Sequence, residues 1–429
     1  MSQLNRSIGP VGAVSIGLAA MIGAGLFFVW GPASAIAGAW LPAALVLAGV
    51  VATVNALSTA QLAMEHPVSG GAYAYGRAEA KPWIGFSAGW MFVTGKTFSA
   101  AAIALVAARH IDQDGAAAWA VIALVALAIV NILGIRLTSA ISTVIVVLVL
   151  AAVVFALVWN AFGNASTLTQ VSDSTSVVAD SDSLMAAFGL GTVPALGVLQ
   201  AAGILFFAFA GYARMATLGE EVRDPRRTLP RAIVTALVIV LVLYGLVAFA
   251  VTGTFRDRLP ESMTPVADLV GHPVLHIVLL AAAVVACLGS LMGILAGLSR
   301  TSMAMARDGE LPGVLGKINA RTRTPVVAEI ACTCLAIIAV VTLPPSGLVA
   351  FSSTFVLGYY AVAHFAAIRM RARLADAGSG PRMWLPRWLP WFGLISCLVI
   401  VLTLSWVGVV AAIAWLGLGL LFRRTFASR

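Results

Sequence analysis

An apolar run over residues 8–37 is long enough to cross a lipid bilayer, yet Gly23 and Gly25 lie near its centre. Glycine is a poor residue for a helix interior, and inside a membrane each backbone group that a helix releases needs another partner. A helix that opens at mid-depth is therefore expected where it lines a cavity. The pattern predicts a discontinuous helix whose backbone groups bind a small polar solute. Close packing of small residues between helices is the alternative explanation.

The composition indicates an integral membrane protein. Of the 429 residues, 61% are hydrophobic and only 10% are charged, and the mean hydropathy is +1.01. A soluble chain carries about 25% charged residues. The net charge of +9 would suit a protein that binds nucleic acid, but most Lys and Arg residues lie in a few short loops. That distribution is typical of a chain with several transmembrane helices, so we expect no nucleic-acid partner.

Apolar runs of suitable length predict twelve transmembrane helices. Alternate loops hold most of the basic residues, and both termini belong to the basic set, which predicts that both termini are cytoplasmic. The four cysteines lie within apolar runs, so we expect packed thiols and no disulfide, metal ion or cofactor. The predicted spans are 8–36, 40–64, 83–108, 116–134, 138–162, 193–217, 231–253, 273–300, 326–343, 347–369, 389–404 and 406–422.

The sixth predicted span contains a second interruption. Gly211 lies about half-way along it, and small residues alternate with phenylalanines over 205–214. Interrupted helices at matching positions of two halves are typical of transporters. We therefore predict a single transmembrane domain over 1–429. It would contain inverted repeats at 1–162 and 193–370 and two extra helices within 389–422.

Five motifs spread over most of the chain carry a family resemblance. They are Gly-Ala-Gly-Leu-Phe at 23–27; Pro-Val-Ser-Gly-Gly-Ala-Tyr at 67–73, which includes Ser69; Phe206 to Gly211; Glu220, Glu221 and the Val-Arg-Asp-Pro that follows; and residues 299–312. In this order they resemble the amino acid–polyamine–organocation superfamily. The C-terminal region, with Pro390, Trp391 and Cys397, is most similar to its cationic-amino-acid-transporter-like branch. The resemblance implies an all-α, LeuT-like permease of five-plus-five helices, with helices one and six broken.

The resemblance also implies that the two breaks form the substrate site. Free amides at the first break suit a carboxylate, because helix N-termini favour anions, and carbonyls at the second break suit an ammonium group. No Asp lies near the first break, which favours amino acids over amines that lack a carboxylate. The implied substrate-binding residues are Ile22, Gly23, Ala24, Gly25, Leu26, Phe27, Phe206, Phe207, Ala208, Phe209 and Gly211.

Two residues of the sixth span are candidates for gates. Phe207 matches the aromatic residue that caps the substrate in relatives, and its alternative role is ordinary packing among three phenylalanines. Arg214 is expected to face the cytoplasmic vestibule and to pair with Glu220 or Glu221 in an inner gate. The alternative is an Arg whose charged end reaches the cytoplasmic surface.

Lys96 is the most informative charged residue. It lies thirteen residues after Trp83, which is about 20 Å along a helix, too deep for its ammonium group to reach the surface easily. Ionisable groups at such depth mark function. Many relatives carry a Lys in span five, where this chain is aliphatic over 144–149. We expect Lys96 to replace that cation, bracing the broken helix and exchanging a proton; a Lys that only donates to carbonyls is the alternative.

These features predict a secondary active transporter for amino acids that works by alternating access. Small or medium neutral L-amino acids are the expected substrates, with protons as a candidate coupling ion; Ser290 is a weaker candidate for a sodium ligand. The alternative is a cationic amino acid or polyamine carrier that uses Glu329. The chain is not expected to be an enzyme, because its five histidines are scattered near span ends. Its richness in Ala and Val and its few Lys residues indicate a bacterial cytoplasmic membrane.

Overall fold

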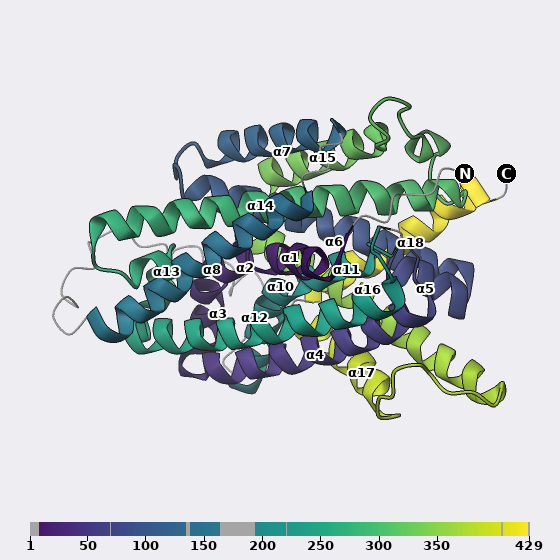
Figure 1. The fold of residues 1–429 in the computed structure, drawn as a ribbon, viewed down its shortest axis with the longest axis horizontal. Coiled ribbons are helices and arrows are strands. Elements are labelled where there is room, and N and C mark those ends of the chain that lie inside the picture. The colour runs from purple at the N-terminus through teal and green to yellow at the C-terminus, as the bar shows by residue number, and fades with distance from the viewer. Residues whose placement is uncertain are drawn as a thin grey trace.

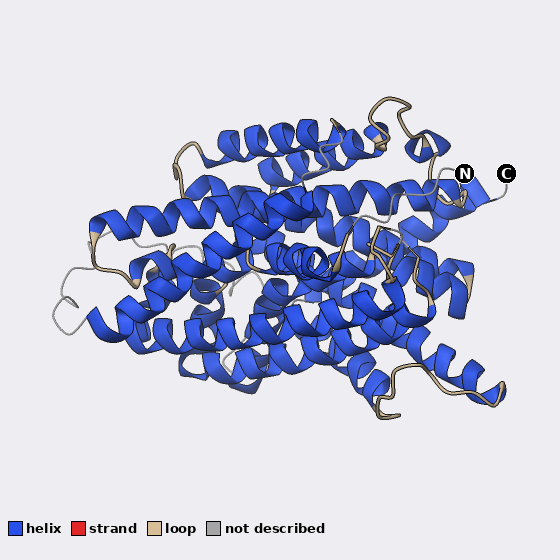
Figure 2. Ribbon diagram, viewed as in Figure 1, coloured by secondary structure: helices blue, strands red, loops and turns tan. Residues whose placement is uncertain are grey.

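The computed structural model describes residues 8–68, 70–133, 138–163, 194–219, 221–404 and 406–427, and every regular element within these ranges is a helix (Figure 1, Figure 2). Ser69 and Glu220, two residues of the sequence motifs, lie outside the described residues. A single backbone bridge joins Ile8 to Val222, so the segment that precedes the first helix lies beside the segment after the sixth predicted span.

The helices follow the predicted spans closely. Those of the first half are α1 (Pro10–Met21), α2 (Ala24–Phe28), α3 (Trp30–Ala37), η1 (Gly38–Trp40), α4 (Leu41–Glu65), α5 (Ala72–Glu79), α6 (Pro82–Arg109), α7 (Ala116–Ile132) and α8 (Thr138–Gly163). Those of the second half are α10 (Pro194–Phe209), η2 (Ala210–Tyr212), α11 (Ala213–Ala216), α12 (Pro225–Phe255), η3 (Arg256–Glu261), α13 (Pro265–Asp268), α14 (Pro273–Arg307), η4 (Gly313–Gly316), α15 (Val326–Thr342), α16 (Pro345–Asp376), α17 (Leu389–Leu404) and α18 (Trp406–Ala427).

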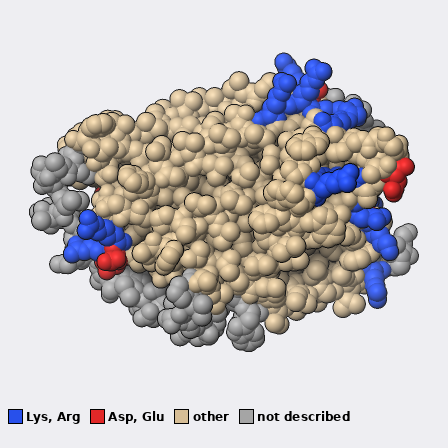
Figure 3. All heavy atoms as spheres, turned by 90° about the horizontal axis from the view of Figure 1, so that it is seen from below, with Lys and Arg blue, Asp and Glu red and all other residues tan. Residues whose placement is uncertain are grey.

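The exterior of this bundle suits a lipid environment. Among the described residues, nine helical segments are long and apolar enough to cross a membrane, and α7, α15 and α17 are shorter apolar helices. Large apolar side chains such as Phe249 and Ile413 are exposed, at 82% and 66%. On the face drawn in Figure 3, charged side chains gather at the two ends and leave a broad uncharged band between them. The described chain is therefore an all-helical membrane protein.

The first interruption lies at Gly23. Helix α1 ends at Met21, Ile22 and Gly23 form a bend, and α2 begins at Ala24. A Cβ on Gly23 would come within 2.6 Å of the Cβ of Ser290 on α14. The chain bends here because a glycine allows α14 to approach and costs little when it leaves the helical conformation.

At the second interruption the helix does not open; its last turn narrows from α to 3₁₀ geometry. Helix α10 ends at Phe209, the 3₁₀ turn η2 follows, and α11 completes the segment. Gly211 of η2 packs directly on the backbone carbonyl of Ala20, where a Cβ would have no room. The change from α to 3₁₀ geometry alters which carbonyls are bonded within the helix and leaves some of them free for other partners.

Helices α6 and α14 connect the interrupted segments to the rest of the bundle. Helix α6 packs on α16, α14 and α2, and α14 packs on α1 and α2. Helix α12 packs on α4 and on α1, on the other side of the breaks. In Figure 1, α7 and α15 lie side by side along one edge of the bundle, and α17 lies along the opposite edge. The breaks therefore lie inside the protein, away from lipid.

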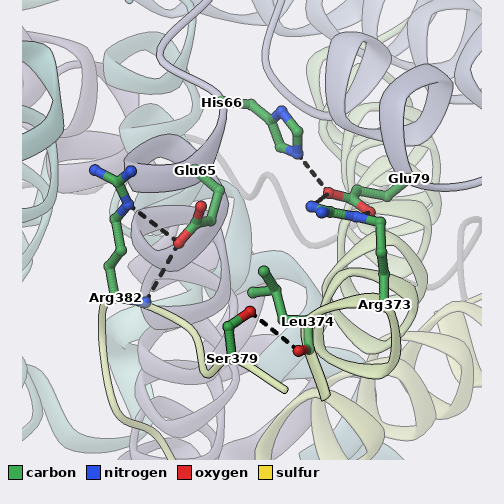
Figure 4. Close-up of polar contacts among 7 residues, drawn as sticks. All are labelled: Glu65, His66, Glu79, Arg373, Leu374, Ser379 and Arg382. Carbon is green, nitrogen blue, oxygen red and sulfur yellow. Dashed lines mark hydrogen bonds and ion pairs between the residues drawn. The ribbon is translucent and has the colours of Figure 1, made fainter. Parts of the chain in front are cut away.

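A network of ion pairs closes the end of the bundle at which α14 and α16 finish. Glu79 accepts hydrogen bonds from Arg373 Nε and Nη2, at 2.9 and 2.6 Å, and lies 2.6 Å from Nε2 of His66 (Figure 4). Nearby, the main-chain N–H of Arg382 donates to Glu65 at 3.3 Å. Burial alone raises the pKa of Glu79, but its hydrogen bonds to Arg373 and His66 outweigh this effect and lower the pKa below its usual value.

This network predicts a loss of stability in acid. Because the pKa of Glu79 is lower in the folded chain, the stabilisation is present above the unfolded value near 4.5 and is lost as the pH falls through the folded value. Glu79→Gln should cost roughly 2 kcal/mol at pH 7 and should flatten the dependence of the melting temperature on pH below about 5. Thermal unfolding of both proteins from pH 3 to 7 measures this, and parallel curves would contradict it.

Candidate functional site

A small, narrow pocket lies where the two interruptions meet. The closest approach of the two segments is at Gly25, where a Cβ would be 2.5 Å from the Cα of Ala208. The residues that line the pocket are Ala20, Met21, Ala24 and Gly25 of the first interrupted segment, Lys96, Ser99 and Ile103 of α6, Phe207, Ala208 and Gly211 of the second interrupted segment, and Ser290 and Ile294 of α14.

Side chains from three neighbouring helices bind the carbonyls beside the breaks. Lys96 Nζ on α6 donates to the Ala210 carbonyl at 3.0 Å. Ser290 Oγ on α14 donates to the Ala20 carbonyl at 3.3 Å. Tyr244 on α12 lies 2.6 Å from the Met21 carbonyl and 3.2 Å from the Ala208 carbonyl. Freed backbone groups in a membrane interior need partners, and these three side chains supply them.

Tyr244 contacts both interruptions at once. Its hydroxyl has a single proton, so it can donate fully to only one of the two carbonyls at a time. Its ring packs edge-on against Trp30 and Phe209, with centroid distances of 6.0 and 4.9 Å, and is 1% exposed. Sequence reasoning missed this residue. The available signal was a tyrosine at the middle of an apolar span, since membrane tyrosines usually lie at the interface.

Five of the eleven expected substrate-binding residues line the pocket. Ala24, Gly25, Phe207, Ala208 and Gly211 line it. Ile22, Gly23, Leu26, Phe27, Phe206 and Phe209 are buried around it without lining it.

Only one of the three phenylalanines in the second interrupted segment faces the pocket. Phe206 packs edge-on against Tyr360 at 5.8 Å, and Phe209 packs against Tyr244. Phe207 is the one that lines the pocket. At the first break, the Leu26 amide donates to the Gly23 carbonyl at 3.0 Å. The amides of Ala24 and Gly25, at the start of α2, are left without partners inside that helix.

The charge in the pocket comes from Lys96. It is the ionisable residue among the described residues that line this cavity, and its side chain is buried. Glu329, the acid considered for a cationic substrate, accepts a hydrogen bond from Asn131 at 2.9 Å and does not line the pocket. The described lining therefore offers positive charge and polar backbone groups, without a carboxylate.

Of the two acids expected to pair with Arg214, Glu220 lies outside the described residues, and Glu221 makes no direct hydrogen bond or ion pair with it. Glu221 instead accepts a hydrogen bond from Arg300 of α14, and Arg214 Nη1 donates to Thr217 Oγ1 at 2.8 Å. Thr217 is three residues further along the same segment, so this local contact forms readily. Arg214 lines a second cavity, which lies beside the first.

Comparison with known proteins gives consistent results over most of the chain. The sequence profile of a family described as amino acid permease matches residues 12–416. An uncharacterized transporter of Mycobacterium tuberculosis is 42% identical over 97% of this chain and 90% of its own length. The branched-chain amino acid permease BcaP of Bacillus subtilis is 25% identical over 97% of this chain and 92% of its own length. The vacuolar cationic amino acid transporter 4 of Arabidopsis thaliana is 29% identical over 78% of this chain and 58% of its own length.

The profile match extends from the first interrupted helix to the last helix and so includes every residue that lines the central pocket. Together with the long apolar helices, it shows that this multi-pass membrane protein belongs to the amino acid permease family of the amino acid–polyamine–organocation superfamily.

Proposed function

We propose that this protein carries small or medium neutral L-amino acids across the cytoplasmic membrane of a bacterium by alternating access, without changing them chemically. The observation that carries the proposal is the pocket between the two breaks, which combines the first amides of α2 with carbonyls of the second break and has Lys96 as its charged group. An amino acid needs donors for its carboxylate and acceptors for its ammonium group, and both kinds of group are present. The name of the Bacillus subtilis relative, a branched-chain amino acid permease, agrees with a neutral substrate.

In this proposal the carboxylate binds at the start of α2. The amides of Ala24 and Gly25 and the positive end of the helix dipole favour an anion. The ammonium group binds carbonyls of the second break, and Phe207 covers the substrate from that side. Such a division of charge between two half-helices is the usual arrangement in transporters with interrupted helices.

Lys96 braces the second break in this mechanism. Its ammonium group already donates to the Ala210 carbonyl, so a change in its protonation or position would change the shape of the η2 turn. Proton coupling through Lys96 is the finer hypothesis, and a purely structural Lys96 is the alternative to it.

The transport cycle would use two inverted repeats within twelve transmembrane helices. The repeats would cover 1–162 and 193–370, and helices α17 and α18 would stand outside them. The larger gathering of basic residues at the end where α14 and α16 finish favours a cytoplasmic location for that end and for both termini.

A cationic amino acid or a polyamine is the second candidate substrate, and the name of the Arabidopsis relative favours it. Such a substrate would bring a positive charge into the pocket that contains Lys96. Among the described residues no acid lines that pocket, which is why a neutral substrate is the first choice.

Uptake into proteoliposomes tests the proposal. We would measure a panel of labelled neutral and cationic amino acids and putrescine, with and without an inward proton gradient at fixed sodium. Accumulation of a neutral amino acid that depends on the gradient would support a proton symporter. Uptake only into vesicles preloaded with amino acid would indicate an exchanger, and no uptake of any amino acid would contradict the proposal.

Tyr244→Phe tests whether the hydroxyl between the breaks matters for transport. Phenylalanine keeps the ring packing and removes one hydrogen bond worth about 1 kcal/mol, so we expect uptake to fall about fivefold while expression is unchanged. Tyr75→Phe is the matched control, because the Tyr75 hydroxyl is buried without a hydrogen-bond partner in the described part of the chain. Equal uptake by the two variants would show that the Tyr244 hydroxyl has no role in transport.

A further inference from the structure

A second, narrow cavity adjoins the central pocket. Ala20 of α1 lines both. Three segments contribute to both cavities, namely α1, the segment that contains η2 and α11, and α14, while α6 lines only the first and Ser142 of α8 only the second.

The second cavity is displaced toward the end where α14 finishes. On α14 the lining of the second cavity starts at Gly289, beside Ser290, and extends to Arg300, and on the sixth span the lining changes from Gly211 to Arg214 and Glu221. On α1 it moves back to Ile16 and Ile8. On each of the three segments the second cavity extends further toward the basic end of the bundle than the first.

Arg214, one of the charged residues that line this cavity, has no carboxylate of the described residues in direct contact, although Glu221 and Glu329 act on its charge from a distance. Arg300 binds Glu221. Arg214 is only 7% exposed and has no ion pair within the described ranges. Its one side-chain hydrogen bond goes to Thr217, and its Nε has no partner there. A buried guanidinium has five donors and strongly favours a carboxylate that can accept two of them together.

From this geometry we infer that the second cavity is a separate binding station for the transported amino acid. Arg214 binds the α-carboxylate, and the carboxylate of Glu221, oriented by Arg300, faces the ammonium group. The station rests on the proposed amino acid transport, and it adds a second site on the path between the central pocket and the basic end. Its ligand is any amino acid with a free α-carboxylate, because the cavity recognises the groups common to all of them.

The test is the number of amino acids bound per chain at saturation. The full-length protein in nanodiscs is dialysed against the radiolabelled amino acid that is taken up fastest in the proteoliposome panel. Wild type should bind two molecules per chain. Arg214→Met should bind one, with the affinity of the remaining site changed less than about threefold. Arg371→Met is the matched control, since Arg371 is bound to Gln61 and Pro386 outside both cavities, and it should bind two.

A second pair of variants tests the site independently, in case Arg214→Met fails to fold. Gly293 lines the second cavity, and a Cβ there would meet no atom within 4 Å. Gly293→Asp places a carboxylate in the cavity with Arg214 and should remove the second site, whereas Gly293→Ala should keep it.

The outcomes separate the two hypotheses. One molecule per chain in wild type, with normal uptake, would overturn the second station and leave the transport proposal intact. Two molecules in wild type and also in both Arg214→Met and Gly293→Asp would show that the extra site lies elsewhere and would equally overturn the station. If no amino acid is taken up and none is bound, both the proposed function and the station fail.

Discussion

Gly25→Ala is expected to weaken substrate binding strongly. The added Cβ would lie 2.5 Å from the Cα of Ala208. Because the obstructing atom belongs to the backbone, no side chain can rotate away, and the two interrupted segments must separate. Such overpacking costs about 1–3 kcal/mol, which corresponds to a rise in Kd of roughly tenfold or more. Binding of the labelled amino acid by the purified protein measures this change directly.

The matched control for this prediction is Gly245→Ala. Gly245 lies within α12 on the exposed side, and a Cβ there would meet nothing within 4 Å. This variant should bind and transport as wild type does. If Gly25→Ala also kept its affinity, the close approach of the two breaks would not be part of the binding site.

Lys96→Met is expected to reduce the maximal rate of uptake by about tenfold. Methionine keeps most of the volume of the lysine side chain but leaves the Ala210 carbonyl without its donor. An unsatisfied buried polar group costs about 1–3 kcal/mol, and tenfold in rate corresponds to about 1.4 kcal/mol. Initial rates in proteoliposomes measure the change, with Lys81→Met as the control because Lys81, just before the same helix, is exposed.

The pH dependence separates the two roles considered for Lys96. If Lys96 is only a brace, Lys96→Met should be slower at every pH with an unchanged profile. If Lys96 exchanges the coupled proton, the variant should also lose accumulation driven by the gradient, while exchange of internal for external amino acid persists. Normal transport with unchanged pH dependence would eliminate both roles.

Hydropathy predicted the apolar middle of each helix more accurately than the residues at which the helix begins and ends. For the predicted span 83–108 the structure has α6 at Pro82–Arg109, with proline in its first turn. Helices α12, α14 and α16 extend beyond their predicted spans toward the basic end, to begin at Pro225 and to end at Arg307 and Asp376. These extensions contain many charged residues, which form a helix as readily as apolar ones but do not register in a search for apolar runs.

The two helix interruptions could be predicted from their glycines because backbone conformation is largely a local property. Gly23 and Gly211 lie within the observed breaks, and no knowledge of their neighbours is needed to see that a helix is weak there. The depth of Lys96 could likewise be read from its distance to the nearest span end.

The sequence by itself determined the class of membrane protein, the approximate bounds of the helices and the positions of the breaks, since these depend on hydropathy and on local backbone preference. Only the tertiary structure decided which partners meet across the bundle. Phe207 faces the pocket while Phe206 and Phe209 do not, because successive residues of α10 point in different directions around the helix and its packing decides which side meets the pocket. The contacts of Tyr244 with both breaks, and of Glu221 with Arg300 instead of Arg214, join residues far apart in the chain. Such pairings follow from how helices pack, which no local pattern records.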